Sequence, residues 1–216
     1  MSRIKTGLIA VLIISFCLPT AFARTKKDKT GTITDSVYTD AEYGFKFTIK
    51  SNWEGKVFTE PSNYRLQVEQ TNPEIPPEYA NYADQMPRPT MSVYMATTDL
   101  APLAFVDSLL SETYKSDQKK EILQDIDFYD ENVTFQGFTT RVKKEIKIGE
   151  MKGVQWEGSA TYKIKMGEQA MDNEVALGLI GVKKGDHILL FLTGHDKRFF
   201  RKLFDEATEM AMSVKW

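Results

Sequence analysis

Two histidines are the only imidazole side chains in this 216-residue sequence, and their spacing limits the chemistry they can share. His187 and His195 flank an apolar run that is predicted to be a strand, which places them about 26 Å apart at about 3.3 Å per residue. They cannot ligate one metal ion within one molecule, because zinc–nitrogen bonds are about 2.1 Å long. No Gly-x-Ser-x-Gly motif accompanies them, so a serine-based triad is not indicated. We expect neither histidine to be catalytic.

Carboxylates are concentrated at Asp125, Asp127, Asp130 and Glu131. Such oxygen ligands suit Ca²⁺ when a turn brings them together. The EF-hand pattern is not met, because Tyr129 stands where a ligand belongs and the required glycine is missing. We therefore expect a solvated loop and no metal site. Because acids are plentiful and the sequence gives no distances between them, a hydrolase that uses paired carboxylates stays open as an alternative.

The amino-terminal segment is typical of a secretory signal peptide. Arg3 and Lys5 precede an apolar run, and an A-x-A cleavage site ends at Ala23. The run is shorter than the ~20 residues that a membrane-spanning helix needs. We expect residues 1–23 to be removed and the protein to be periplasmic or extracellular. The single cysteine, Cys17, leaves with this segment, so we expect no disulfide, no thiolate metal site and no cofactor in the remaining chain.

Charge and hydropathy exclude further classes of partner. The formal net charge is −2 and the sequence pI is about 5.8, whereas nucleic-acid binding usually needs a basic surface. No later apolar run approaches membrane length, so we expect no transmembrane segment after signal cleavage. The expected partner is another protein or an envelope component. The sequence leaves the oligomeric state open.

Alternation of apolar and polar residues predicts a body rich in strands. Phe45, Phe47 and Ile49 alternate with polar residues, and similar patterns cover 64–70 and 90–97. Further strands are expected after residue 133, with a bulge or corner at Gly137. The run 187–193 is almost continuously apolar, which predicts a central strand that is covered on both faces.

Two amphipathic helices are expected, one from Pro102 to about residue 115 and one over 196–213. Residues 24–36 are polar and basic without periodicity, which predicts a flexible tail before a single domain over 37–216. Five prolines between 73 and 89 predict a long loop over 71–90. Hairpins interrupted by one helix and closed by another indicate an α+β fold, in which helices flank an antiparallel sheet.

The stretch Tyr43-Gly44-Phe45-Lys46-Phe47-Thr48-Ile49, followed by Ser51-Asn52-Trp53, resembles the opening hairpin of PsbP-like domains. The order of the later elements is also similar to that family, which includes photosystem II accessory proteins and periplasmic DcrB-like proteins. The resemblance implies an α/β/α sandwich and a role in binding or assembly. It implies no catalytic residues, and Gly44, Phe45 and Trp53 carry over only as structural positions.

Two groups of residues are candidates for partner binding. Tyr79 and Tyr82 are one helical turn apart in the proline-rich loop and could present a joint aromatic surface, or they could anchor the loop to the body. The second group crowds the start of the last helix, where cations oppose the helix dipole. It is a docking patch for an acidic partner or an ordinary solvated face, and comprises Lys197, Arg198, Arg201 and Lys202.

The sequence thus favours an exported, non-catalytic binding or assembly factor of the cell envelope. A carboxylate hydrolase and a small-molecule carrier are the alternatives. An apolar pocket with converging acids would favour the enzyme. A closed core with an exposed aromatic or basic patch would favour the assembly factor.

Overall fold

The computed structural model describes residues 28–59, 62–75, 77, 81, 88–111, 116–123, 132–167, 169–195 and 197–216. For Met166, Arg198 and Phe199 it describes the backbone alone. The predicted signal peptide, residues 1–23, lies outside the described residues.

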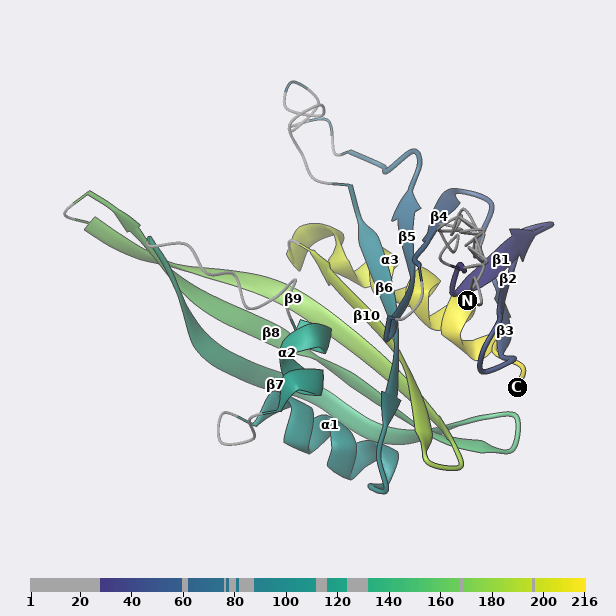
Figure 1. Ribbon diagram of the computed structural model, residues 1–216. Helices are drawn as coiled ribbons and strands as arrows, with labels where there is room; N and C mark the ends of the chain where they lie inside the picture. The colour runs from purple at the N-terminus through teal and green to yellow at the C-terminus, as the bar shows by residue number, and fades with distance from the viewer. Residues whose placement is uncertain are drawn as a thin grey trace, which may run out of the picture.

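A seven-stranded antiparallel sheet forms the centre of the fold, with the strand order β4-β5-β6-β10-β9-β8-β7. Its strands are β4 (Trp53–Val57), β5 (Tyr64–Gln70), β6 (Thr90–Thr97), β7 (Val133–Ile148), β8 (Met151–Met166), β9 (Gln169–Lys184) and β10 (His187–His195). The strands predicted over 64–70 and 90–97 are confirmed. Figure 1 shows that β7, β8 and β9 reach well beyond the other strands at one end of the sheet.

A smaller sheet packs on one side of the central sheet and contains β1 (Gly31–Thr34), β2 (Val37–Asp40) and β3 (Lys46–Thr48). The prediction of a flexible tail over 24–36 is therefore wrong from Lys29 onward. Thr30 is fully buried, and its backbone N–H donates to the carbonyl of Phe58 at 2.9 Å. Because this burial depends on strands that come later in the chain, the polar local sequence gives no sign of it.

Three helices cover the central sheet on both faces: α1 (Pro102–Leu110), α2 (Asp117–Leu123) and α3 (Lys197–Met212). Helices α1 and α2 lie on one face, and α3 lies on the other beside the small sheet (Figure 1). Pro102 occupies the first turn of α1, as its fixed φ favours. The α+β fold with helices flanking an antiparallel sheet is confirmed.

Each face of the sheet has its own hydrophobic core, because neighbouring residues of a strand point to opposite faces. Leu189 and Phe191 of β10 join the core under α3, whereas Ile188, Leu190 and Leu192 join the core under α1 and α2. The prediction that this strand is covered on both faces is confirmed. We call the two sides the α3 face and the α1/α2 face.

The long edge strand β7 bends at two bulges. The register with β8 shifts at Gly137, as predicted, and again between Thr140 and Val142, which was not predicted. Bulges of this kind turn an edge away from further strand pairing. Among the helices that the structure describes, none has the length and apolar composition needed to cross a membrane.

Candidate functional site

A pocket of about 480 Å³ opens on the α1/α2 face of the central sheet. Helices α1 and α2 have nine and seven residues, whereas the strands beneath them run to sixteen. Within the described residues, these short helices therefore cover only part of this face. The described residues that line the pocket are Gln67, Thr90, Ser92, Val133, Tyr162, Ile164, Asn173, Val175, Leu177, Leu192 and Gly194.

Small side chains on neighbouring strands form the hollow. Thr90 of β6 lies directly opposite Gly194 of β10, which in turn lies opposite Leu177 of β9. A Cβ atom at Gly194 would come within 2.6 Å of Leu177 Cδ2, so the glycine lets this leucine lie close to the strand. The six contributing strands are separated in the sequence, which is why no local motif marks the pocket.

Aromatic residues pack together on the strands at two sides of the pocket. The Tyr64 and Ser92 hydroxyls form a hydrogen bond of 2.6 Å, and the Tyr64 ring stacks on Tyr94 with 4.4 Å between the centroids. Tyr162 is 7% exposed, and its ring centroid lies 5.7 Å from that of Phe135. Ring contacts of this kind add about 0.5–1.5 kcal/mol beyond the area they bury, so they stabilise the strands around the pocket.

The described lining of the pocket is mainly apolar, with a few polar groups. Its described polar groups are hydroxyls and amides, from residues such as Ser92, Asn173 and Gln67, and they include no carboxylate, amine, imidazole or thiol. The Tyr162 phenol is the one titratable group among the described lining residues. The Ser92 hydroxyl shares its hydrogen bond with the Tyr64 hydroxyl. The lining suits an uncharged, mainly apolar ligand.

The predicted basic face of α3 is brought together, and its described cations are paired within the chain. Lys197 bonds Glu174 of β9, and Lys202 Nζ lies 2.7 Å from Glu74. The hydrogen bond from Lys197 lowers the pKa of the Glu174 carboxyl, and the bond to Glu74 raises the pKa of Lys202. These carboxylate partners explain why Lys197 and Lys202 are tolerated at the start of a helix.

Arg201 completes this pairing. Its guanidinium lies 3.1 Å from Asp205 in the next turn and 3.4 Å from the buried Glu157 of β8. Glu157 also accepts from Arg141 of β7, so it links α3 to the bulge of the edge strand. The side chain of Arg198 lies outside the description.

Of the remaining sequence candidates, the structure describes only the two histidines, and they lie apart. Tyr79, Tyr82 and the carboxylates over 125–131 lie outside the described residues. His187 and His195 stand at opposite ends of β10. The His187 ring packs edge-on against Tyr43, with 5.0 Å between centroids. In the described part of the chain, no three His, Cys, Asp or Glu side chains lie close enough to hold a metal ion.

The structure contains two buried polar networks that the sequence did not predict. Asp40 binds the Arg65 guanidinium, with 2.8 Å between Nε and Oδ2, and the Tyr38 hydroxyl donates to Oδ2 of the same carboxylate at 3.0 Å. Burial raises the pKa of Tyr38, with a further contribution from Asp40. The network joins the small sheet to β5, so its role is structural.

The second network centres on Glu206 of α3, which is 9% exposed. Its Oε2 accepts hydrogen bonds from Trp53 Nε1 at 2.7 Å, Asn52 Nδ2 at 3.2 Å and Gln70 Nε2 at 3.3 Å. Trp53 is 5% exposed, which confirms that it belongs to the core. The Trp53 indole, which the resemblance marks as a structural position, therefore also anchors α3.

No family model matches the chain, and no curated protein matches it. Solved structures that are similar include a cyanobacterial PsbP from Synechocystis sp. PCC 6803, with a TM-score of 0.46 and 8% identity over 83% of this chain and 90% of that one. They also include LpqN of Mycobacterium tuberculosis, involved in cell envelope biogenesis, with a TM-score of 0.44 and 14% identity over 88% and 91%. At these scores neither carries an inference about function, and membership of the PsbP-like family stays a prediction.

Proposed function

We propose that this chain is an exported, non-catalytic binding protein of the cell envelope that holds an uncharged, mainly apolar ligand in the pocket on the α1/α2 face. The observation that carries the proposal is the lining of that pocket, which combines apolar side chains with a few hydroxyl and amide groups. Ligand sites in proteins have this composition and volumes of about 300–1,000 Å³. Of the alternatives that the sequence left open, this proposal is closest to the small-molecule carrier.

The buried carboxylates argue against a hydrolase. A glycosidase needs two carboxyl groups that face a common cavity. In the described residues, Asp40 is bound to Arg65, and Glu157 is bound to two arginines. Glu206 accepts three hydrogen bonds from neutral donors. None of these three carboxylates lines the pocket.

Export rests on the segment 1–23, and it has its own test. The mass of the intact protein, recovered from the exported fraction, is expected to match a chain that begins at Arg24. A mass that includes residues 1–23 would contradict export by cleavage. This result would leave the pocket proposal untouched.

The pocket is tested with N-phenylnaphthylamine, an uncharged aromatic probe that becomes fluorescent in apolar surroundings. We expect saturable binding to the full chain. Asn173→Trp should weaken binding about ten-fold or more, because Asn173 is an exposed residue that lines the pocket and an indole there fills its mouth.

Ala170→Trp is the matched control for this experiment. Ala170 is also an exposed, uncharged residue of β9, and the alternation of the strand places it on the opposite face from Asn173. We expect its affinity for the probe to match that of the wild type. Absence of saturable binding, or an equal loss in both variants, would refute the proposed site.

A further inference from the structure

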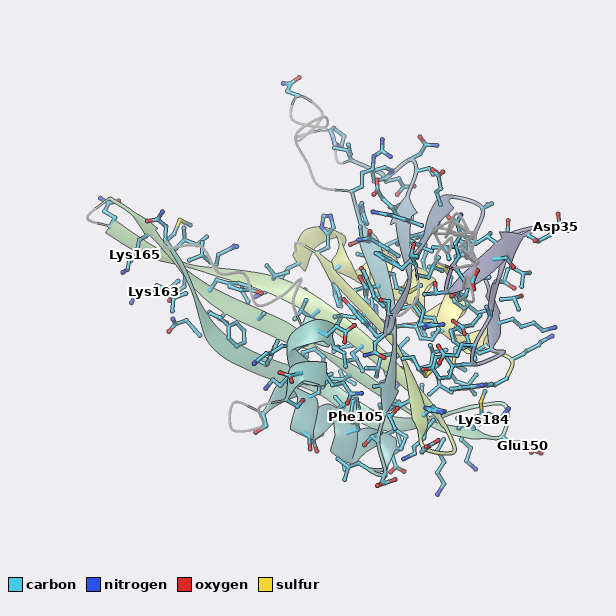
Figure 2. All side chains as sticks on the ribbon, in the orientation of Figure 1. Asp35, Phe105, Glu150, Lys163, Lys165 and Lys184 are labelled. Atoms are coloured by element: carbon cyan, nitrogen blue, oxygen red, sulfur yellow. The ribbon has the colours of Figure 1, made fainter. Side chains whose placement is uncertain are left out.

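A groove of about 880 Å³ lies at the end of the sheet where the β7–β8 and β9–β10 hairpins turn. The start of α1 and the last residues of the chain complete its walls. Figure 2 shows Lys184 and Glu150 at this end, and Lys163 and Lys165 at the far end of the sheet. The ionisable side chains that line the groove are Asp99, Glu150, Lys152, Lys183, Lys184 and Lys215.

Three lysines face one another across neighbouring strands beside this groove. Lys147 of β7 lies directly opposite Lys152 of β8, which lies directly opposite Lys183 of β9. We call these three residues the lysine row. Like charges that are directly opposite in a sheet destabilise it. Within the described residues, none of the three ammonium groups forms an ion pair with a carboxylate.

Backbone carbonyls hold one member of the lysine row in place. Lys183 Nζ donates to the carbonyls of Thr98 and Leu100, at 2.6 Å each, in the segment before α1. On the other side of the hairpins, Lys184 Nζ lies 5.7 Å from the centre of the Trp216 ring. These contacts position Lys183 and Lys184, and neither ammonium group forms an ion pair within the described residues.

The groove also receives the positive end of a helix. Pro102 is at the start of α1, and the first turn of this nine-residue helix contains no acidic side chain. Unpaired N–H groups at a helix start favour anions. The lysine row and the helix start therefore point to the same kind of ligand.

Composition does not explain this concentration of cations, because the whole sequence carries a net charge of −2. On α3, by contrast, Lys197, Arg201 and Lys202 each have a carboxylate partner. Among the described side chains, the three cations of α3 therefore have carboxylate partners, whereas those of the lysine row have none.

We propose that this groove binds a phosphate-bearing anion through Lys152 and Lys183, with Lys147 beside them in the lysine row. A phosphate accepts several charge-assisted hydrogen bonds, and it would compensate the repulsion within the lysine row. The site lies apart from the apolar pocket, so the two proposals can fail separately. The phosphate can belong to a free polyphosphate or to a phospholipid headgroup, and the test separates these sources.

The test compares two double variants that remove the same charge. Lys147→Gln with Lys152→Gln is the groove variant and changes two exposed lysines of the row, whereas Lys163→Gln with Lys165→Gln is the control and changes exposed lysines at the other end of the sheet. The probes are tripolyphosphate, followed by calorimetry at low salt, and sedimenting phosphatidylcholine vesicles with or without phosphatidylglycerol. We expect the affinity of the groove variant for the probe to fall about ten-fold or more. The affinity of the control should equal that of the wild type.

Binding of tripolyphosphate identifies a free phosphate as a sufficient ligand, and binding only to phosphatidylglycerol vesicles identifies a lipid headgroup. Either result supports the proposed site if the groove variant loses affinity for the probe and the control does not. The thermal unfolding temperature of the groove variant should equal or exceed that of the wild type, because removal of Lys152 relieves the row. The proposal is wrong if neither probe binds the wild type, or if both double variants lose affinity equally.

Discussion

The two faces of the central sheet are covered in different ways. On the α3 face, a sixteen-residue helix lies along the strands, and its buried Glu206 is bound to Trp53. On the α1/α2 face, two shorter helices leave a pocket of about 480 Å³. The difference shows that one face of a single sheet can be closely packed while the other retains a cavity.

The largest expected effect concerns the anchor of the closed face. Trp53→Ala should lower the free energy of unfolding by about 3–5 kcal/mol, because it removes a buried indole and one donor to Glu206. Urea unfolding followed by circular dichroism measures this change. Trp53→Phe is the control and should cost less, since it keeps a buried ring. A near-neutral Trp53→Ala would mean that α3 does not depend on this contact.

A smaller effect is expected at Gly178 of β9, where the strand meets α3. A Cβ atom there would lie 2.1 Å from two ring carbons of Phe204, and the ring is buried. Gly178→Ala should therefore cost about 1–3 kcal/mol of unfolding free energy, because the helix or the ring must shift. A stabilised variant would show that the α3 face is packed less tightly than we describe.

The matched substitution on the α1/α2 face should cost least. A Cβ atom at Gly194 would meet the terminal Cδ2 of Leu177, a flexible side chain that borders the pocket and can rotate into it. Gly194→Ala should change the unfolding free energy by less than about 1 kcal/mol, since alanine also restricts the unfolded chain. If its cost equals that of Gly178→Ala in the same assay, the contrast between the faces fails.

Strands and helices that have a periodic pattern of apolar residues could be predicted from the local sequence. The alternation around Phe47 predicted β3, the apolar run from Ile188 predicted β10, and the stripe that contains Leu203 predicted α3. In each case the burial pattern repeats within a few residues of sequence. The bulge at Gly137 was predicted for the same reason, because it interrupts an alternation.

Features that depend on distant residues could not be predicted. Strand β1 is polar, and it is stable because Thr30 is buried against residues such as Phe58 and Arg65. The cations of α3 have no acidic partner nearby in the sequence that would explain them. Glu74, which pairs with Lys202, is more than one hundred residues away, and Glu174, which pairs with Lys197, is about twenty residues away. The pocket is formed by residues of six strands, and the lysine row by residues of three paired strands.

The central claim is that the ligand binds on the α1/α2 face, and methyl NMR during titration with N-phenylnaphthylamine tests it most directly. We predict saturable shifts for the methyl groups of Ile164, Val175 and Leu177, which line the pocket. Methyl groups of Val93, Leu189 and Leu203, which are buried under α3, should not shift. Shifts confined to the α3 face, or none at saturating probe, would contradict the account.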